Sequence, residues 1–128
     1  MKVLVIDDEP AIRDILRTWL GKAGITVFEA ANGLEGMQVQ ENTPVDLLIC
    51  DLIMPVQEGI ETITSFRQRY PVVGIIAISG GGRLLPDSYL ELAQQLGAWK
   101  VFRKPLDLSA IVQAVQEWCG QKGATSDR

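Results

Sequence analysis

The chain has 128 residues, of which 47% are hydrophobic and 22% charged, with 12 glycines and 6 prolines. This length and composition are typical of one globular domain and exclude a collagen-like or mostly disordered chain. The net charge of −4 argues against a general nucleic-acid binder, which needs clustered Lys and Arg, and the lack of histidine excludes all histidine-based catalysis.

Five short apolar runs alternate with five longer amphipathic stretches. We predict strands at the apolar runs, which are residues 3–6, 26–30, 45–50, 72–78 and 101–102. We predict helices over residues 10–21, from residue 32 onward, and over residues 58–70, 87–97 and 108–119. Pro10 suits a first helical position, and Asn32 with Glu35 resembles a capping box. Residues 1–119 are therefore expected to form one domain, followed by a flexible tail over residues 120–128.

This order predicts an α/β fold of the (βα)5 type, with an open parallel five-stranded sheet and helices on both faces. Residues 45–50 form an uninterrupted apolar run after Asp46, which suits the centre of a parallel sheet. In such folds the ligand site lies beyond the carboxyl ends of the strands. The polar residues that end the predicted strands therefore belong to one candidate site.

Neither cysteine is expected to form a disulfide bond. Cys50 lies inside an apolar run, which favours a reduced and packed thiol, and Cys119 is far away in sequence. The first apolar run is too short for a secretory signal, and no run approaches the length of a membrane span. We therefore expect a cytoplasmic protein that does not bind a membrane.

Polar side chains follow four of the five predicted strands. Asp7 and Asp8 end the first strand, Asp51 the third and Ser79 the fourth, and Lys104 follows the fifth. Three neighbouring carboxylates repel one another unless a cation compensates, and a hard divalent ion such as Mg²⁺ suits oxygen ligands. A metal, an ammonium group and a hydroxyl are what phosphoryl transfer requires. Because a carboxylate can act as the nucleophile and Asp51 stands alone on the central strand, we predict that Asp51 attacks phosphorus.

Four motifs together resemble those of response-regulator receiver domains of two-component signalling, including single-domain regulators of the chemotaxis type. They are VLVIDDEP from residue 3, DLIMP from residue 51 with Gly59, ISG from residue 78 and KPL from residue 104. The resemblance covers residues 2–119 and implies a flavodoxin-like fold. It also implies that the chain accepts a phosphoryl group from a sensor histidine kinase or a histidine phosphotransfer protein.

The resemblance assigns a metal site and a phospho-acceptor. It implies that Asp51 is phosphorylated and that Asp8 binds Mg²⁺ (or Mn²⁺) directly, together with Asp51 and the backbone carbonyl of Ile53. Asp7 would hold a water molecule bound to the metal. The chain is then a switch rather than an enzyme, and only self-phosphorylation from small donors and slow self-dephosphorylation are expected.

The remaining implied roles concern the response to phosphorylation. Lys104 would pair with the phosphoryl group, and Ser79 would donate its hydroxyl to it on activation, with Gly80 leaving room for that approach. A cis bond between Lys104 and Pro105 is also implied.

The sequence departs from the family pattern at three places. Val101 stands where an aromatic switch residue is usual, and Phe102 is expected to point to the opposite face of its strand. The glycine-rich loop over residues 80–87 is longer than usual, and we expect phosphorylation to order it. Trp99 replaces a usual polar residue, either as a partly buried ring or as an anchor for a partner.

Two other tryptophans, Trp19 and Trp118, lie on predicted core-facing helical stripes and are expected to pack in the core.

Several readings of the function stay open. The output would be contact with an unknown protein through the fourth helix, fifth strand and fifth helix, without direct nucleic-acid binding, as a monomer or a phosphorylation-dependent dimer. The chain is either a stand-alone receiver or a fragment of a larger regulator. A Mg²⁺-dependent phosphohydrolase would usually have an aspartate where Ile53 stands. A flavodoxin-like mononucleotide binder would have to hold phosphate against Asp7, Asp8 and Glu9.

Overall fold

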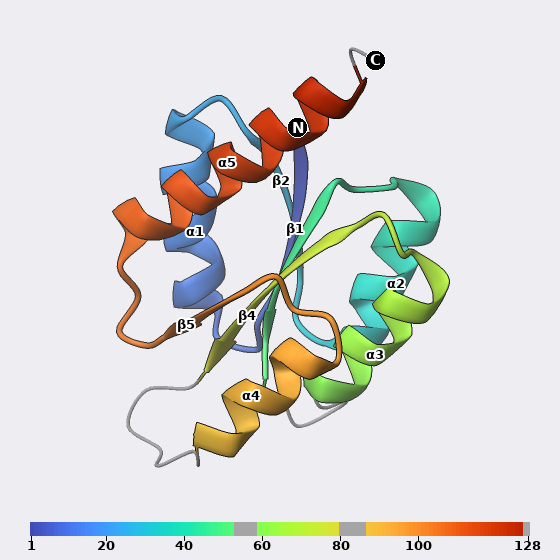
Figure 1. Cartoon of the computed structure of the whole chain (residues 1–128). Helices are drawn as coiled ribbons and strands as arrows, with labels where there is room; N and C mark the ends of the chain where they lie inside the picture. The colour runs from blue at the N-terminus through green and yellow to red at the C-terminus, as the bar shows by residue number, and fades with distance from the viewer. Residues whose placement is uncertain (53–58, 80–86, 127–128) are drawn as a thin grey trace.

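Figure 1 shows the computed structural model of the chain, which describes residues 1–52, 59–79 and 87–126. Strands and helices alternate through these residues. Their bounds are β1 Lys2–Ile6, α1 Pro10–Lys22, β2 Thr26–Ala30, α2 Gly33–Asn42, β3 Leu47–Asp51, α3 Gly59–Arg69, β4 Gly74–Ser79, α4 Asp87–Gln95, β5 Lys100–Arg103 and α5 Leu108–Ser126. Nowhere in the described part does a helix combine the length and apolar character needed to cross a bilayer.

The strands form one parallel sheet in the order β2-β1-β3-β4-β5. This arrangement confirms the predicted (βα)5 architecture. β3 lies at the centre and every residue of it is buried, as its uninterrupted apolar run predicted. The register pairs Ile6 with Cys50 and Ser79 with Arg103, so the carboxyl ends of β1, β3, β4 and β5 meet at one edge of the sheet.

Helices cover both faces of the sheet. In Figure 1, α1 and α5 lie on one side, and α2, α3 and α4 lie on the other. Alternate residues of β1 supply the two cores, with Val3 and Val5 packing toward α1 and α5 and Leu4 and Ile6 packing toward the opposite layer. The helix α2 comes close to the sheet because Gly36 has no side chain: a Cβ there would lie 2.2 Å from the Ile6 side chain.

The predicted starts of the first two helices are confirmed. Pro10 is the first residue of α1, where its missing N–H group costs nothing. The Asn32 side chain accepts a hydrogen bond of 2.9 Å from the Glu35 N–H, and Glu35 Oε1 accepts one of 3.1 Å from the Ala31 N–H. These bonds satisfy backbone donors that the helix itself leaves free.

Three details of the packing differ from the predictions. The last helix continues past Cys119 to Ser126, so it is longer than its apolar pattern indicated. The strand β4 begins at Gly74 rather than at residue 72, and Val72 is 74% exposed. Trp19 was expected to pack in the core, but it is 40% exposed because it lies at the seam between α1 and α5, beside Lys22 and Gln116.

The predictions for the other aromatic and sulfur side chains hold. Trp118 packs against the core that α1 and α5 share, and its indole N–H donates a 3.0 Å hydrogen bond to the carbonyl oxygen of Asp46. Cys50 is buried and Cys119 exposed, and both are free thiols. Burial, followed by the nearby Asp51 and Asp7 charges, raises the pKa of the Cys50 thiol well above its usual value, so this sulfur stays protonated.

Candidate functional site: an acidic cluster at the carboxyl edge of the sheet

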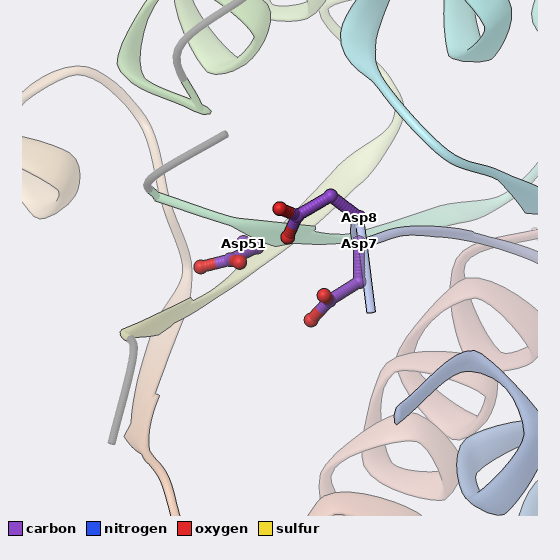
Figure 2. Close-up of side chains that lie close together, drawn as sticks. All are labelled: Asp7, Asp8 and Asp51. Carbon is purple, nitrogen blue, oxygen red and sulfur yellow. The ribbon is translucent and has the colours of Figure 1, made fainter. Parts of the chain in front are cut away.

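Three aspartates from two strand ends lie together at this edge. Asp7 and Asp8 follow β1, and Asp51 is the last residue of β3. One carboxylate oxygen from each lies within 4.8 Å of the others, and Figure 2 shows the three side chains gathered around one small region. Asp7 and Asp51 are buried and Asp8 is exposed, so the cluster opens to solvent on the side of Asp8. The predicted convergence of carboxylates is therefore present.

A lysine from the adjacent part of the sheet edge completes the cluster. Lys104 follows β5, its N–H donates a 3.0 Å hydrogen bond to the Ser79 carbonyl oxygen, and its bond to Pro105 is cis, as the resemblance implied. The ammonium nitrogen lies 3.1 Å from Asp7 Oδ2 and 3.6 Å from Asp51 Oδ2. Because the Lys104 side chain is only 7% exposed, its charge faces these carboxylates rather than bulk water.

A third carboxylate, which the sequence analysis did not assign to the site, also holds this lysine. Glu9 Oε1 accepts a hydrogen bond of 3.0 Å from the Lys104 ammonium group, across 95 positions of the chain. The Glu9 side chain is 58% exposed, in contrast to the buried side chain of Asp7. The lysine is therefore shared between two buried aspartates and one glutamate at the surface.

Backbone contacts hold Asp7 in place. Its Oδ1 accepts a 2.8 Å hydrogen bond from the Glu9 N–H, and its carbonyl oxygen accepts one of 2.7 Å from the Arg13 guanidinium. Its own N–H donates to the Ala30 carbonyl oxygen at 3.2 Å. The start of α1 and the end of β2 thus fix the position of the carboxylate that neighbours the lysine.

Burial and the neighbouring charges shift the pKa values of Asp7 and Lys104. Burial raises the pKa of Asp7 above its usual value, although the Glu9 N–H and the Lys104 ammonium act in the opposite direction. For Lys104, burial alone would lower the pKa, but the hydrogen bond with Glu9 and the charges of Asp51 and Asp7 outweigh it and raise the pKa. Lys104 therefore stays positively charged, while the charge on Asp7 is costly.

The first residue of α3 lies directly against the end of β3. The Gly59 N–H donates a 3.0 Å hydrogen bond to the Leu52 carbonyl oxygen. A Cβ on Gly59 would lie 1.9 Å from the Asp51 carbonyl oxygen, which is far inside van der Waals contact. Glycine is thus required here for α3 to reach the strand end that carries Asp51.

The donor set of this cluster fits a magnesium ion. All three groups offer carboxylate oxygens, which hard divalent cations prefer. Asp7 Oδ2 is buried and accepts no hydrogen bond from the described residues, although the Lys104 ammonium lies 3.1 Å away. A cation would satisfy this oxygen and relieve the repulsion among the carboxylates. The predicted backbone ligand Ile53 lies outside the described residues.

The other predicted site residues are placed as follows. Ser79 is buried at the end of β4, between the strands that carry Asp51 and Lys104. Val101 packs toward α4, and Phe102 packs toward α5, so the predicted alternation along β5 is present. Gly80 and residues 81–86 of the loop that was expected to become ordered lie outside the described residues.

Trp99 packs against the helix that follows β5. Its ring centroid lies 5.2 Å from that of Trp118 in α5, and the Lys100 ammonium lies 5.0 Å from the Trp99 ring centroid. These contacts favour the expected partly buried ring, and the role as an anchor for a partner stays a prediction.

The site residues that sequence reasoning missed are Glu9 and Arg13. The sequence indicates Glu9 only as a charge that repels phosphate, yet Glu9 pairs with Lys104 in the structure. Arg13 begins the second turn of α1 and reaches back to the end of β1. The signal for Arg13 was its place one turn after the acidic run, on the helix that starts at Pro10.

The fold and the site together define an α/β protein with an acidic, lysine-containing cluster at the carboxyl edge of its sheet. The family model of response regulator receiver domains matches residues 3–116. The chain therefore belongs to the response regulator receiver domain family.

Individual relatives agree with this assignment. Sporulation initiation phosphotransferase F of Bacillus subtilis (strain 168) is 30% identical over 91% of this chain and 92% of that protein. The transcriptional regulatory protein GlrR of Escherichia coli (strain K12) is also 30% identical over 98% of this chain, but the match spans only 28% of its own length. A solved receiver domain from Clostridium thermocellum superposes with a TM-score of 0.86 at 26% identity, covering 97% of this chain and 98% of that one.

Proposed function

We propose that this receiver domain is a magnesium-dependent switch that accepts a phosphoryl group on Asp51 and passes the signal on by protein contact. The observation that carries the proposal is the convergence of Asp7, Asp8, Asp51 and Lys104 at one edge of the sheet. Family membership supports phosphorylation as the signal.

The proposed reaction is an in-line transfer to a carboxylate. An Asp51 oxygen attacks phosphorus, a P–O bond forms, and the bond from phosphorus to the donor breaks, with its electron pair staying on the leaving atom. With a phosphohistidine donor that atom is an imidazole nitrogen, which takes up a proton from water. Since the chain contains no histidine, the donor is a histidine kinase or a histidine phosphotransfer protein outside this chain.

The chain's own residues position the group and neutralise its charge. Asp7, Asp8 and Asp51 would hold Mg²⁺, which supplies charge neutralisation at the phosphoryl oxygens when bound. Lys104 offers a buried positive charge 3.6 Å from Asp51 Oδ2. Ser79 ends the strand next to β3 and would donate its hydroxyl to a phosphoryl oxygen.

The proposal includes no turnover of external substrates. The residue two positions after Asp51 is Ile53, which offers no acid or base for such turnover. The output surface is proposed to be α4, β5 and α5, because β5 is an edge strand of the sheet and lies beside Lys104. Its partner is a protein rather than nucleic acid, bound by a monomer or by a dimer that forms on phosphorylation.

The test is phosphorylation by acetyl phosphate, followed by intact-protein mass spectrometry. We expect one added phosphoryl group on the wild type with Mg²⁺, none with a metal chelator and none on Asp51→Asn. The modification should be released by hydroxylamine, as an acyl phosphate is. Labelling of Asp51→Asn at the wild-type level would overturn the assignment of Asp51, and labelling at the same rate in the chelator would overturn the role of the metal.

A further inference from the structure

We propose that Glu9 restrains Lys104 in the unphosphorylated protein and competes with the incoming phosphoryl group for its ammonium. This inference rests on the proposed function and adds a positioning residue to it. The Lys104 ammonium nitrogen lies 3.0 Å from Glu9 Oε1 but 3.6 Å from Asp51 Oδ2. The lysine is thus closer to the glutamate than to the residue whose phosphoryl group it would neutralise.

Hydrogen bonds hold the backbone of Glu9 in place, while its side chain can move away from Lys104 into solvent. Glu9 is the N-cap of α1: its N–H binds Asp7 Oδ1 at 2.8 Å, and its carbonyl oxygen accepts hydrogen bonds from the N–H groups of Ile12 and Arg13. The Glu9 side chain is 58% exposed and has water as an alternative partner. Its carboxylate can therefore release the ammonium without disturbing the helix start.

Lys104 has no such freedom. Its side chain is 7% exposed, and its backbone N–H is bound to the Ser79 carbonyl oxygen at 3.0 Å. The ammonium can shift within the cluster but cannot move into solvent. When a charged phosphoryl group arrives on Asp51, the partner that yields is the exposed one, Glu9.

Glu9 acts on the lysine rather than on the metal. The carboxylates whose oxygens lie within 4.8 Å of one another are Asp7, Asp8 and Asp51, and Glu9 is not one of this group. The contact that Glu9 does make is with the Lys104 ammonium, at 3.0 Å. Its position therefore separates the role of Glu9 from metal binding.

Competition between Glu9 and the phosphoryl group for Lys104 lowers the affinity of the site for that group. Neutralising Glu9 releases Lys104 for the phosphoryl group, so the variant Glu9→Gln should bind a phosphoryl stand-in more tightly. An ion pair with an exposed partner is weak, and the expected gain is about two- to fivefold in affinity. The gain should shrink as salt is added, since salt screens the exposed carboxylate.

The experiment measures beryllofluoride binding in saturating Mg²⁺ by NMR titration, for the wild type, Glu9→Gln and Asp14→Asn. Asp14 is the matched control: it is an exposed acid in α1, the helix that Glu9 precedes, and it pairs with Arg17. Its replacement changes the net charge equally. Calorimetry with Mg²⁺ alone gives a second readout for the same three proteins. Thermal unfolding checks that each variant is folded.

We expect tighter beryllofluoride binding in Glu9→Gln only, with the Mg²⁺ affinity of Glu9→Gln equal to that of Asp14→Asn. Equal gains in both variants would show a general charge effect and overturn the inference. A larger loss of Mg²⁺ affinity in Glu9→Gln than in Asp14→Asn would instead make Glu9 part of the metal site and also overturn it. Lack of beryllofluoride binding to the wild type would refute the proposed function itself, which is a different outcome.

Discussion

The Lys104 ammonium nitrogen lies 3.1 Å from Asp7 Oδ2, and both side chains are almost fully removed from solvent. Even this close cation does not offset the burial of the aspartate, because the pKa of Asp7 is raised, with burial as the main cause. An ionised carboxylate at this position therefore costs stability in the metal-free protein. The lysine still has two further acidic partners, Asp51 and Glu9.

The first prediction is that Asp7→Asn stabilises the metal-free protein at neutral pH by about 1 to 2 kcal/mol. Because the folded-state pKa of Asp7 is raised, its protonation favours the native state: the contribution is fully present below the usual pKa of an aspartate and is lost as the pH rises through the folded-state pKa. The gain of the variant should thus shrink as the pH falls. Urea unfolding of both proteins with a chelator at several pH values measures this gain. Equal stability of the variant and the wild type at neutral pH would contradict the prediction.

The second prediction concerns the metal. At a free Mg²⁺ concentration ten times its dissociation constant, the free energy of unfolding should rise by about 1.4 kcal/mol, because the ion binds the native state alone. The rise should disappear in Asp8→Asn and persist in the control variant Glu117→Gln. The Glu117 carboxylate pairs with Lys100, away from the site. Thermal unfolding with and without a chelator checks this. An equal rise in Asp8→Asn would place the metal elsewhere.

The third prediction follows from the contact between Gly59 and the end of β3. Gly59→Ala should lower stability by about 2 to 4 kcal/mol and slow phosphorylation of Asp51, since the new Cβ meets backbone that carries this aspartate. The control is Gly21→Ala, where a Cβ in α1 meets nothing within 4 Å. That variant should gain about 0.5 to 1 kcal/mol from helix propensity. Similar effects of both substitutions would refute the role of the contact.

The fourth prediction concerns Arg67, whose side chain joins the end of α3 to the turn between α4 and β5. The Arg67 guanidinium donates hydrogen bonds to the carbonyl oxygens of Pro71, Val73 and Gly97, at 2.6, 3.1 and 3.1 Å. It thereby ties the end of α3 to the turn that leads into β5. Arg67→Met should lower the free energy of unfolding by about 2 kcal/mol, because the partly buried carbonyl groups of Val73 and Gly97 lose this donor.

The matched control for Arg67→Met is Arg69→Met, which removes an exposed salt bridge with Glu41 at 3.6 Å. This variant should change stability by less than about 0.5 kcal/mol. Denaturant unfolding of both variants measures the difference. If the two losses are equal, the three carbonyl contacts of Arg67 do not stabilise the fold.

Much of the site could be predicted because its residues follow strands with clear apolar patterns. The carboxyl ends of parallel strands share one edge, so a pattern that identifies β1 and β3 also brings Asp7 and Asp51 together. The start of the second helix could be predicted equally well, since the capping bonds of Glu35 with Asn32 and Ala31 span only three or four residues. Local signals of this kind act within one turn and need no knowledge of the packing.

The amino-acid sequence by itself determined the order of the elements and which acidic and basic groups reach the edge of the sheet. Only the tertiary structure decided which of these groups contact one another, as Glu9 contacts Lys104 across 95 positions. It also decided that Trp19 stays 40% exposed where α1 meets α5. The physical reason is that periodicity specifies the face on which a side chain lies. Its distance to another element depends on how closely helices and strands pack, down to the missing Cβ of Gly59.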